Sequence, residues 1–285
     1  MKASLKILVI TYQMVPCSPN WGSCQRVYYL AQHLLGRGHH VHVLSAELDH
    51  YGYLGHECSF RQHLRPIDSC IYRRFLTASG EGDERSAAQE KEAGRSAEVQ
   101  NATSPPRASW TAATAKGLLK KASQAYFGGI FPVVELKAWL WQRGLKSYLA
   151  DLLLREPMDA VVISAPPFAV FHLLEQAKRT CPDIPVVLDY RDPWSLGRMH
   201  RGPYRGREAR LLSRADAVVG FSDQFAGDMV QAFDISPEKI ATVWNGYSHA
   251  AWVPVLHRHE NGPARTPVAP LVVSHVGSVS VGSGY

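Results

Sequence analysis

The chain has 285 residues, a formal net charge of +6 and 46% apolar residues. This apolar share supports a sizeable core and excludes a wholly disordered chain, and the length allows one large domain or two ordinary ones. The positive charge favours an anionic partner, which a nucleotide, a membrane surface or a nucleic acid would satisfy equally well.

The N-terminal part predicts a strand–loop–helix–strand unit. Its expected elements are a strand at 5–12 (LKILVITY), a loop at 13–22, an amphipathic helix at 23–35 ended by Gly36 and Gly38, and a strand at 40–45. Such a unit places Gly22 and Ser23, at the start of the helix, on the carboxyl edge of a parallel sheet. Helix N-termini at that edge bind phosphates.

The middle of the chain is less regular. Residues 46–66 predict an irregular segment and residues 70–76 a third strand. Residues 77–109 consist mainly of Ser, Ala, Gly, Glu, Arg and Gln, with almost no large apolar side chain. Burial of so few apolar groups does not offset the entropy of ordering, so we predict a disordered insertion there.

Residues 112–156 predict helices with a basic surface. One helix is expected around 118–126, and a longer one spans Val134 to Leu152. Six basic and two acidic residues lie between positions 116 and 151. Three interpretations stay open: helices that cover the sheet with a charged outer face, helices on an anionic membrane surface, or an RNA contact.

From residue 159 onward strands and helices alternate regularly. Strands are expected at 159–164, 185–189, 215–221 and 239–243, and helices at 167–179, 208–212 and 222–233, the last N-capped by Ser222. A linker at 253–270 and a strand at 271–276 follow. The alternation predicts an α/β fold with a doubly wound, Rossmann-like parallel sheet.

Polar residues directly follow two of these strands. In the segment DYRDPW, Asp192 is suited to accept hydrogen bonds from a sugar hydroxyl, and Trp194 to stack on a sugar face. Arg191 points to the same crevice, and Ser164 ends the preceding strand. The alternatives are an Arg–Asp pair that closes a turn, a core position for Trp194, and a serine that merely precedes a proline-started helix.

Several common sites have no sequence support. The chain lacks GxGxxG after the first strand, GxxxxGK[ST] and Gly-x-Ser-x-Gly. The five cysteines are scattered without a CxxC, and among the clustered His39, His40 and His42 only the last two share a strand face, so we expect no metal site. With no signal peptide and no apolar run near the ~20 residues of a membrane span, we predict a cytoplasmic protein.

Seven short motifs occur in a specific order. They are KILVITY with the loop to Gly22, LAQHLLGRGHHVHV at 30–43, SAPP at 164–167, VVLDYRDPW at 186–194, RADAVV at 214–219, KIATVWNG at 239–246 and HVGS at 275–278. Together they resemble the N-terminal half of a retaining glycosyltransferase of family 4 with the GT-B fold. SAPP and DYRDPW are similar to the branch that builds bacterial surface polysaccharides and lipid-linked sugars.

The resemblance implies transfer of a sugar from a nucleotide-sugar donor to a glycan or lipid-linked acceptor, with no cofactor, no obligatory metal and no nucleic-acid partner. It implies an N-terminal domain at 1–252, an interdomain linker at 253–270 and the first strand of a second domain at 271–285. The implied roles are catalysis for Asp192, donor-phosphate contact for Gly22 and Ser23, acceptor binding for Arg191, Trp194 and Ser164, and an interdomain position for Asn245, Gly246 and Gly277.

The resemblance leaves the activity of this chain open. The family carries a basic pair and a Glu-x₇-Glu pair in its second domain, and the sequence ends before either. We therefore expect the chain to supply the acceptor-side half of a glycosyltransferase, with peripheral membrane contact through 112–156. The alternative is a non-catalytic or truncated module that acts with a partner chain or at a membrane surface. A nucleotide-dependent oxidoreductase or epimerase lacks both the glycine fingerprint and a Tyr-x₃-Lys pair.

Overall fold

A computed structural model describes residues 4–15, 21–47, 61–66, 132–197, 204–246 and 253. The chain divides into two units, Met1–Asn245 and Gly246–Tyr285, and almost all described residues belong to the first. The expected insertion at 77–109, the helix around 118–126, the strands at 70–76 and 271–276, the linker at 253–270 apart from Val253, and Gly277 lie outside the described residues.

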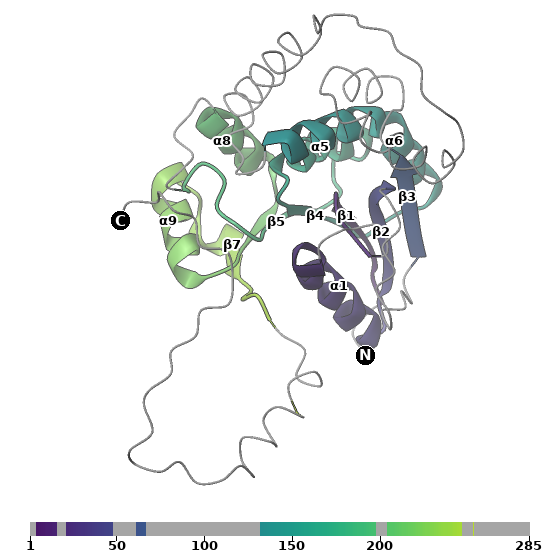
Figure 1. Ribbon diagram of the computed structural model, residues 1–285, viewed down its shortest axis with the longest axis horizontal. Coiled ribbons are helices and arrows are strands. Elements are labelled where there is room, and N and C mark those ends of the chain that lie inside the picture. The colour runs from purple at the N-terminus through teal and green to yellow at the C-terminus, as the bar shows by residue number, and fades with distance from the viewer. Residues whose placement is uncertain are drawn as a thin grey trace, which may run out of the picture. The chain divides into compact units, whose positions relative to one another are not determined.

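Within the described residues, seven strands form one sheet in which every pairing is parallel (Figure 1). The strands are β1 (Lys6–Thr11), β2 (His40–Glu47), β3 (Arg61–Pro66), β4 (Ala160–Ala165), β5 (Val186–Tyr190), β6 (Ala217–Gly220) and β7 (Ile240–Thr242). Their order across the sheet is β3-β2-β1-β4-β5-β6-β7. This order confirms the predicted doubly wound α/β sheet.

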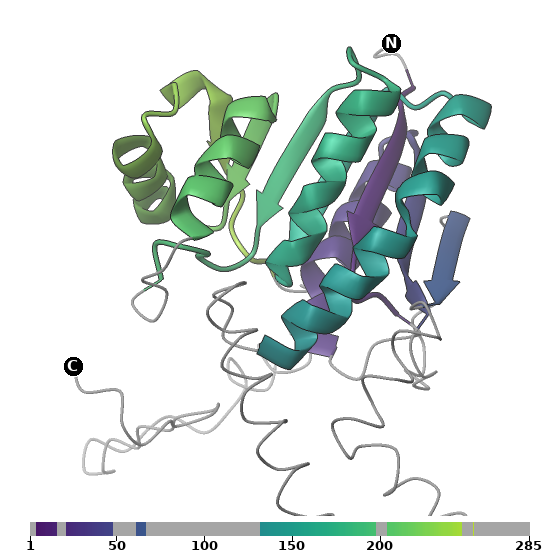
Figure 2. The same ribbon diagram turned by 90° about the horizontal axis from the view of Figure 1, so that it is seen from above.

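Helices cover both faces of the sheet. They are α1 (Trp21–Gly36), α5 (Pro132–Gly144), α6 (Lys146–Arg155), α7 (Leu173–Thr180), α8 (Tyr204–Arg214) and α9 (Asp223–Phe233), with 3₁₀ turns η1 (Phe168–His172) and η2 (Pro237–Lys239). Figure 2 shows α1 on one face and the teal helices that follow β3 on the other. The chain therefore builds a three-layer α/β/α domain.

Burial along β1 shows why both faces need covering. Ile7 and Val9 join a cluster with α1, whereas Leu8 and Ile10 join the larger cluster beneath α5 and α6. Side chains on a strand alternate between faces, so an uninterrupted apolar run such as KILVIT suits a strand buried on both. The N-terminal run thus forms an interior strand that is buried on both faces, as predicted.

Four local predictions differ from the structure. The single helix expected at 167–179 is the 3₁₀ turn η1 followed by the shorter helix α7. β3 lies inside the stretch predicted to be irregular, where it pairs with β2 at one edge of the sheet. The expected single helix over Val134–Leu152 is two helices, α5 and α6, which meet at Gly144–Lys146. α1 begins at Trp21, so Gly22 lies within its first turn and not in the loop before it.

The Ser222 cap is confirmed, since its hydroxyl accepts a hydrogen bond from the Phe225 N–H at 3.2 Å.

The helices α5 and α6 cover the sheet. Trp141 and Leu149 are wholly buried, and the Trp141 ring makes an edge contact with Tyr12 of the sheet layer at 5.6 Å between centroids. Among the described residues, no helix is long and apolar enough to cross a membrane. Of the three interpretations for residues 112–156, packing against the sheet is the one that the described part of the segment shows.

Candidate functional site

The site lies where the strand order reverses. β1 is followed by β2 and β3 on one side and has β4, β5, β6 and β7 on the other. The carboxyl ends of β1 and β4 are neighbours, with Thr11 opposite Ser164, and Ser164 in turn lies opposite Asp189 of β5. In open α/β sheets ligands bind outside the carboxyl ends of the strands at this switch point.

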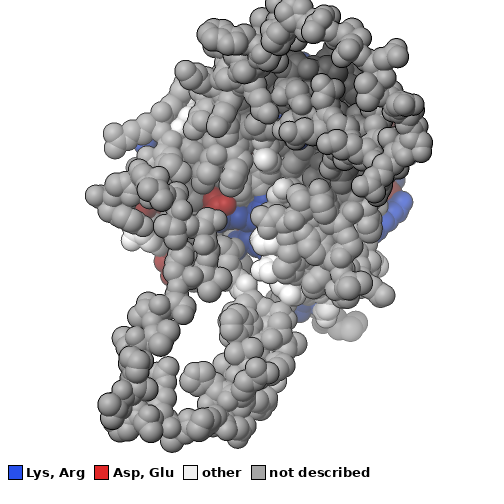
Figure 3. Space-filling model, in the orientation of Figure 1, with Lys and Arg blue, Asp and Glu red and all other residues white. Residues whose placement is uncertain are grey.

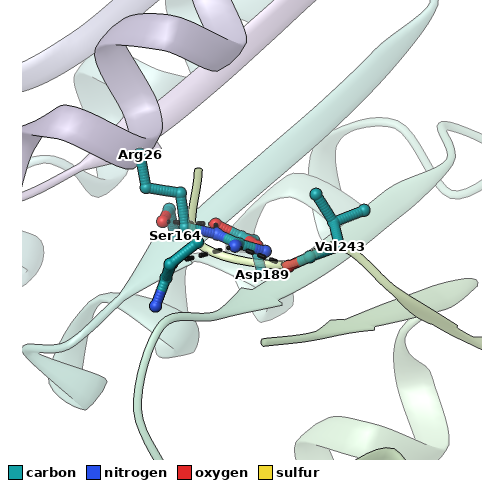
Figure 4. Close-up of polar contacts among 5 residues, drawn as sticks. Arg26, Ser164, Asp189 and Val243 are labelled. Atoms are coloured by element: carbon teal, nitrogen blue, oxygen red, sulfur yellow. Dashed lines mark hydrogen bonds and ion pairs between the residues drawn. The ribbon is translucent and has the colours of Figure 1, made fainter. Parts of the chain in front are cut away.

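Asp189 is the centre of a buried polar cluster at this edge (Figure 4). Its carboxylate accepts a hydrogen bond from the Ser164 hydroxyl at 2.7 Å. The Arg26 guanidinium donates to the same carboxylate, from Nε at 3.0 Å and from Nη2 at 2.8 Å. The side chains of Arg26 and Asp189 are only 9% and 4% exposed. Buried charges need such pairing, because an unpaired one is costly to remove from water.

Arg26 also binds the segment that follows β7. Its Nη1 donates to the Val243 carbonyl at 2.6 Å and to Asn245 Oδ1 at 3.0 Å. One side chain on α1 thus joins the end of β5 to the last residues of the first unit. In the space-filling view, acidic and basic groups meet near the middle of this face (Figure 3).

Arg191 and Asp192 follow β5 directly and differ in exposure. Arg191 is buried, its guanidinium donates to the Pro166 carbonyl, and its backbone N–H donates to the Ala165 carbonyl at 2.8 Å. Burial lowers the pKa of the Arg191 guanidinium, and the carboxylates of Asp189 and Asp192 oppose that shift. Asp192 is exposed, so its carboxylate is open to solvent at the edge of the site.

Trp194 is 2% exposed and lies in an aromatic cluster. Its ring stacks on Phe168 with 5.1 Å between centroids and an interplanar angle of 1°. The next residue is held by Glu208, which accepts a hydrogen bond from the Ser195 N–H at 3.0 Å. Burial raises the pKa of Glu208. The core position that the sequence left open as the alternative is the one observed for Trp194.

Glu135 fixes the segment that follows Ser164. Its carboxylate oxygens accept hydrogen bonds from the backbone N–H groups of Phe168 and Ala169, at 2.8 and 3.0 Å. Burial raises the pKa of Glu135 to about 7, although both hydrogen bonds act in the opposite direction. A group that titrates near neutrality therefore holds the start of η1, beside the switch point.

The structure brings together only some of the predicted site residues. Ser164 and Asn245 are joined through Arg26 and Asp189, to which the sequence assigned no role. Gly22 is exposed in the first turn of α1, four residues before Arg26, and Ser23 lies in the same turn. Gly246 is exposed and ends the last long described stretch.

The described residues contain no group of three or more His, Cys, Asp or Glu side chains placed to hold a metal ion. Two of the histidines pair between β2 and the edge strand β3, where His42 Nδ1 lies 3.1 Å from His63 Nε2. Burial lowers the pKa of both rings. The Tyr148 hydroxyl lies 2.9 Å from His63 Nδ1, so these two rings form part of a core network.

The doubly wound sheet with its polar cluster at the switch point defines a Rossmann-like α/β domain. Residues 22–246 match the family described as "Glycosyl transferase 4-like domain", and the chain belongs to this family. No curated protein matches the chain.

The chain is similar to two solved structures. A glycosyltransferase from Rickettsia africae ESF-5 is 11% identical with a TM-score of 0.41, and 92% of this chain covers 51% of that one. Phytolacca americana UGT2, solved with UDP-2fluoro-glucose and pterostilbene, is 10% identical with a TM-score of 0.47, and 92% of this chain covers 58% of that one. The chain thus spans little more than half the length of these structures.

Proposed function

We propose that this chain supplies the acceptor-side half of a retaining glycosyltransferase, which moves a sugar from a nucleotide-sugar donor to a glycan or lipid-linked acceptor. The observation that carries the proposal is the polar cluster of Arg26, Ser164 and Asp189 at the switch point of a domain that matches the family over 22–246. The exposed Asp192 follows Asp189 by three residues, directly after β5.

The predicted site residues other than Trp194 and Gly277 take the following roles in this proposal. The first turn of α1, with Gly22 and Ser23, faces the donor phosphates, because helix N-termini favour anions. Asp192 lies near the reacting sugar, where its exposed carboxylate reaches a hydroxyl group. Arg191 and Ser164, both buried, support the acceptor side of the site. Asn245 and Gly246 lead to the second domain. The reaction needs no metal in this proposal.

Release of nucleoside diphosphate tests the proposal. A panel of nucleotide sugars is incubated with glycan and lipid-linked acceptors, with the chain alone and with a C-terminal domain of the family added. We expect acceptor-dependent release in the second arrangement and at least a tenfold lower kcat in Asp192→Asn. Asp183→Asn is the matched control, because Asp183 is exposed before the amino end of β5.

The outcomes separate the candidate functions. If no donor and acceptor pair gives release of nucleoside diphosphate, even with the second domain supplied, the enzyme proposal is contradicted and the non-catalytic module is favoured. An unchanged kcat in Asp192→Asn would remove Asp192 from the catalytic role but leave the transfer itself standing.

Contact with an anionic membrane is a further part of the proposal. Arg143, Lys146 and Arg155 are exposed on α5 and α6, and Leu154 of α6 is 68% exposed. We expect co-sedimentation with vesicles that contain anionic lipid, and a loss of binding between low and physiological salt because the attraction is screened. The variant Arg143→Gln/Lys146→Gln is expected to bind less. Equal binding to neutral and anionic vesicles would contradict this part.

A further inference from the structure

Arg26 uses its whole guanidinium group within the fold. Nε and Nη2 donate to Asp189, and Nη1 donates to the Val243 carbonyl and to Asn245 Oδ1. The side chain is only 9% exposed. A surface arginine on a helix gains little from a single exposed pair, whereas this one is buried and bidentate.

These contacts join segments that are far apart in the chain. Asp189 lies 163 residues from Arg26, and Asn245 lies 219 residues from it. The segment after β7 is held from a second side as well, because the Val243 N–H donates to the Gly220 carbonyl at 2.9 Å. Val243–Asn245 (the exit segment, at which the first unit ends) is therefore fixed at the carboxyl edge of the sheet.

The geometry requires arginine. The planar guanidinium presents donors in two directions, toward the carboxylate and toward the exit segment, whereas a lysine ammonium is a single point charge. A lysine at position 26 that paired with Asp189 would leave the Val243 carbonyl and Asn245 without their donor. Charge alone therefore does not replace this side chain.

We propose that Arg26 is a positioning residue that fixes the exit segment against Asp189, so that the sugar-transfer site depends on it without its touching the reacting atoms. The inference rests on the proposed function for its catalytic consequence, whereas its structural part is independent of substrate. Asn245, which the sequence placed at the interdomain segment, is held in its position by this side chain.

Hydrogen–deuterium exchange of the exit segment tests the structural part on the chain alone. We expect the Val243 amide to exchange at least tenfold faster in Arg26→Lys and Arg26→Gln than in the wild type, while β1 and β4 amides keep their rates. Arg61→Gln is the matched control, because it removes a carboxylate-paired but exposed arginine of β3. If Arg26→Gln does not fold, Asn245→Ala removes one Arg26 contact and leaves the Asp189 pair intact.

Unchanged exchange at Val243 in Arg26→Lys and in Asn245→Ala would overturn the proposal. Where transfer is measurable, we expect Arg26→Lys to lower kcat about tenfold or more with less than threefold change in donor KM, since displacement of a positioned group acts on the transition state. A change confined to donor KM would instead assign Arg26 to donor binding. If neither the wild type nor the variants transfer a sugar, that result counts against the proposed function only. The role of Arg26 is decided by the hydrogen–deuterium exchange rate of the Val243 amide.

Discussion

Glu135→Gln is expected to remove a pH-dependent loss of stability of about 2–3 kcal/mol that the wild type shows between pH 5 and pH 8. Burial raises the folded-state pKa of Glu135 from 4.5 to about 7. The folded protein therefore binds a proton that the unfolded chain has already released over this range. The stabilisation from that proton is complete below pH 4.5 and is lost as the pH rises through 7. Glutamine carries no titrating proton.

Denaturant unfolding at several pH values measures this effect. The Gln amide is expected to lose one acceptor, because its NH₂ group then faces a backbone N–H, so the variant is less stable at pH 5 by roughly 1–3 kcal/mol. The difference should shrink or reverse by pH 8. Glu238→Gln serves as control, since Glu238 is exposed. Parallel stability curves for wild type and Glu135→Gln would contradict the expectation.

The position of Glu135 gives this titration a local consequence. Its two oxygens hold the N–H groups of Phe168 and Ala169, and Phe168 stacks on Trp194 in the segment after β5. Ser164, which precedes Phe168 in the chain, donates a hydrogen bond to Asp189. Arg191, which precedes Trp194, donates to the Pro166 carbonyl. The charge state of one buried carboxylate therefore bears on the segments that follow both β4 and β5.

The central part of the fold follows from local sequence patterns. KILVIT, AVVISA and VVLDY are mainly apolar runs of strand length. Such runs are typical of the interior strands of a parallel sheet, because helices cover both faces of these strands. β3 was missed because RQHLRP has a single large aliphatic residue. As an edge strand it pairs with β2 alone, so its partner and not its own composition determines its conformation.

The site was predicted less completely than the fold. Helical periodicity places Arg26 off the apolar stripe of Val27, Leu30 and Ala31, which indicates a solvent-exposed side chain. Its partner lies 163 residues away, and no local pattern reports such a contact. One signal was present: Asp189 is the only charged residue of β5, and a buried carboxylate requires a cationic or hydrogen-bonding partner. Asp189, not Asp192, is the acidic residue that organises the edge.

Trp194→Ala is expected to lower the free energy of unfolding by about 3–5 kcal/mol, the usual cost of truncating a fully buried tryptophan. The indole is 2% exposed, and one face stacks on Phe168. The two interpretations that the sequence left open for Trp194 predict different results. A core residue gives a large loss of stability in Trp194→Ala and a small loss in Trp194→Phe, with the acceptor KM of the latter unchanged. A sugar platform gives a raised acceptor KM in Trp194→Phe.

Trp244→Ala is the matched control, because Trp244 is 64% exposed and lies at the same edge of the sheet. Its truncation is expected to change stability by less than about 0.5 kcal/mol. Thermal unfolding of the two alanine variants separates them, since about 3–5 kcal/mol corresponds to roughly 6–20 °C for a unit of this size. Equal melting temperatures for Trp194→Ala and Trp244→Ala would show that the aromatic cluster around Phe168 contributes little, and would return Trp194 to the acceptor-binding role.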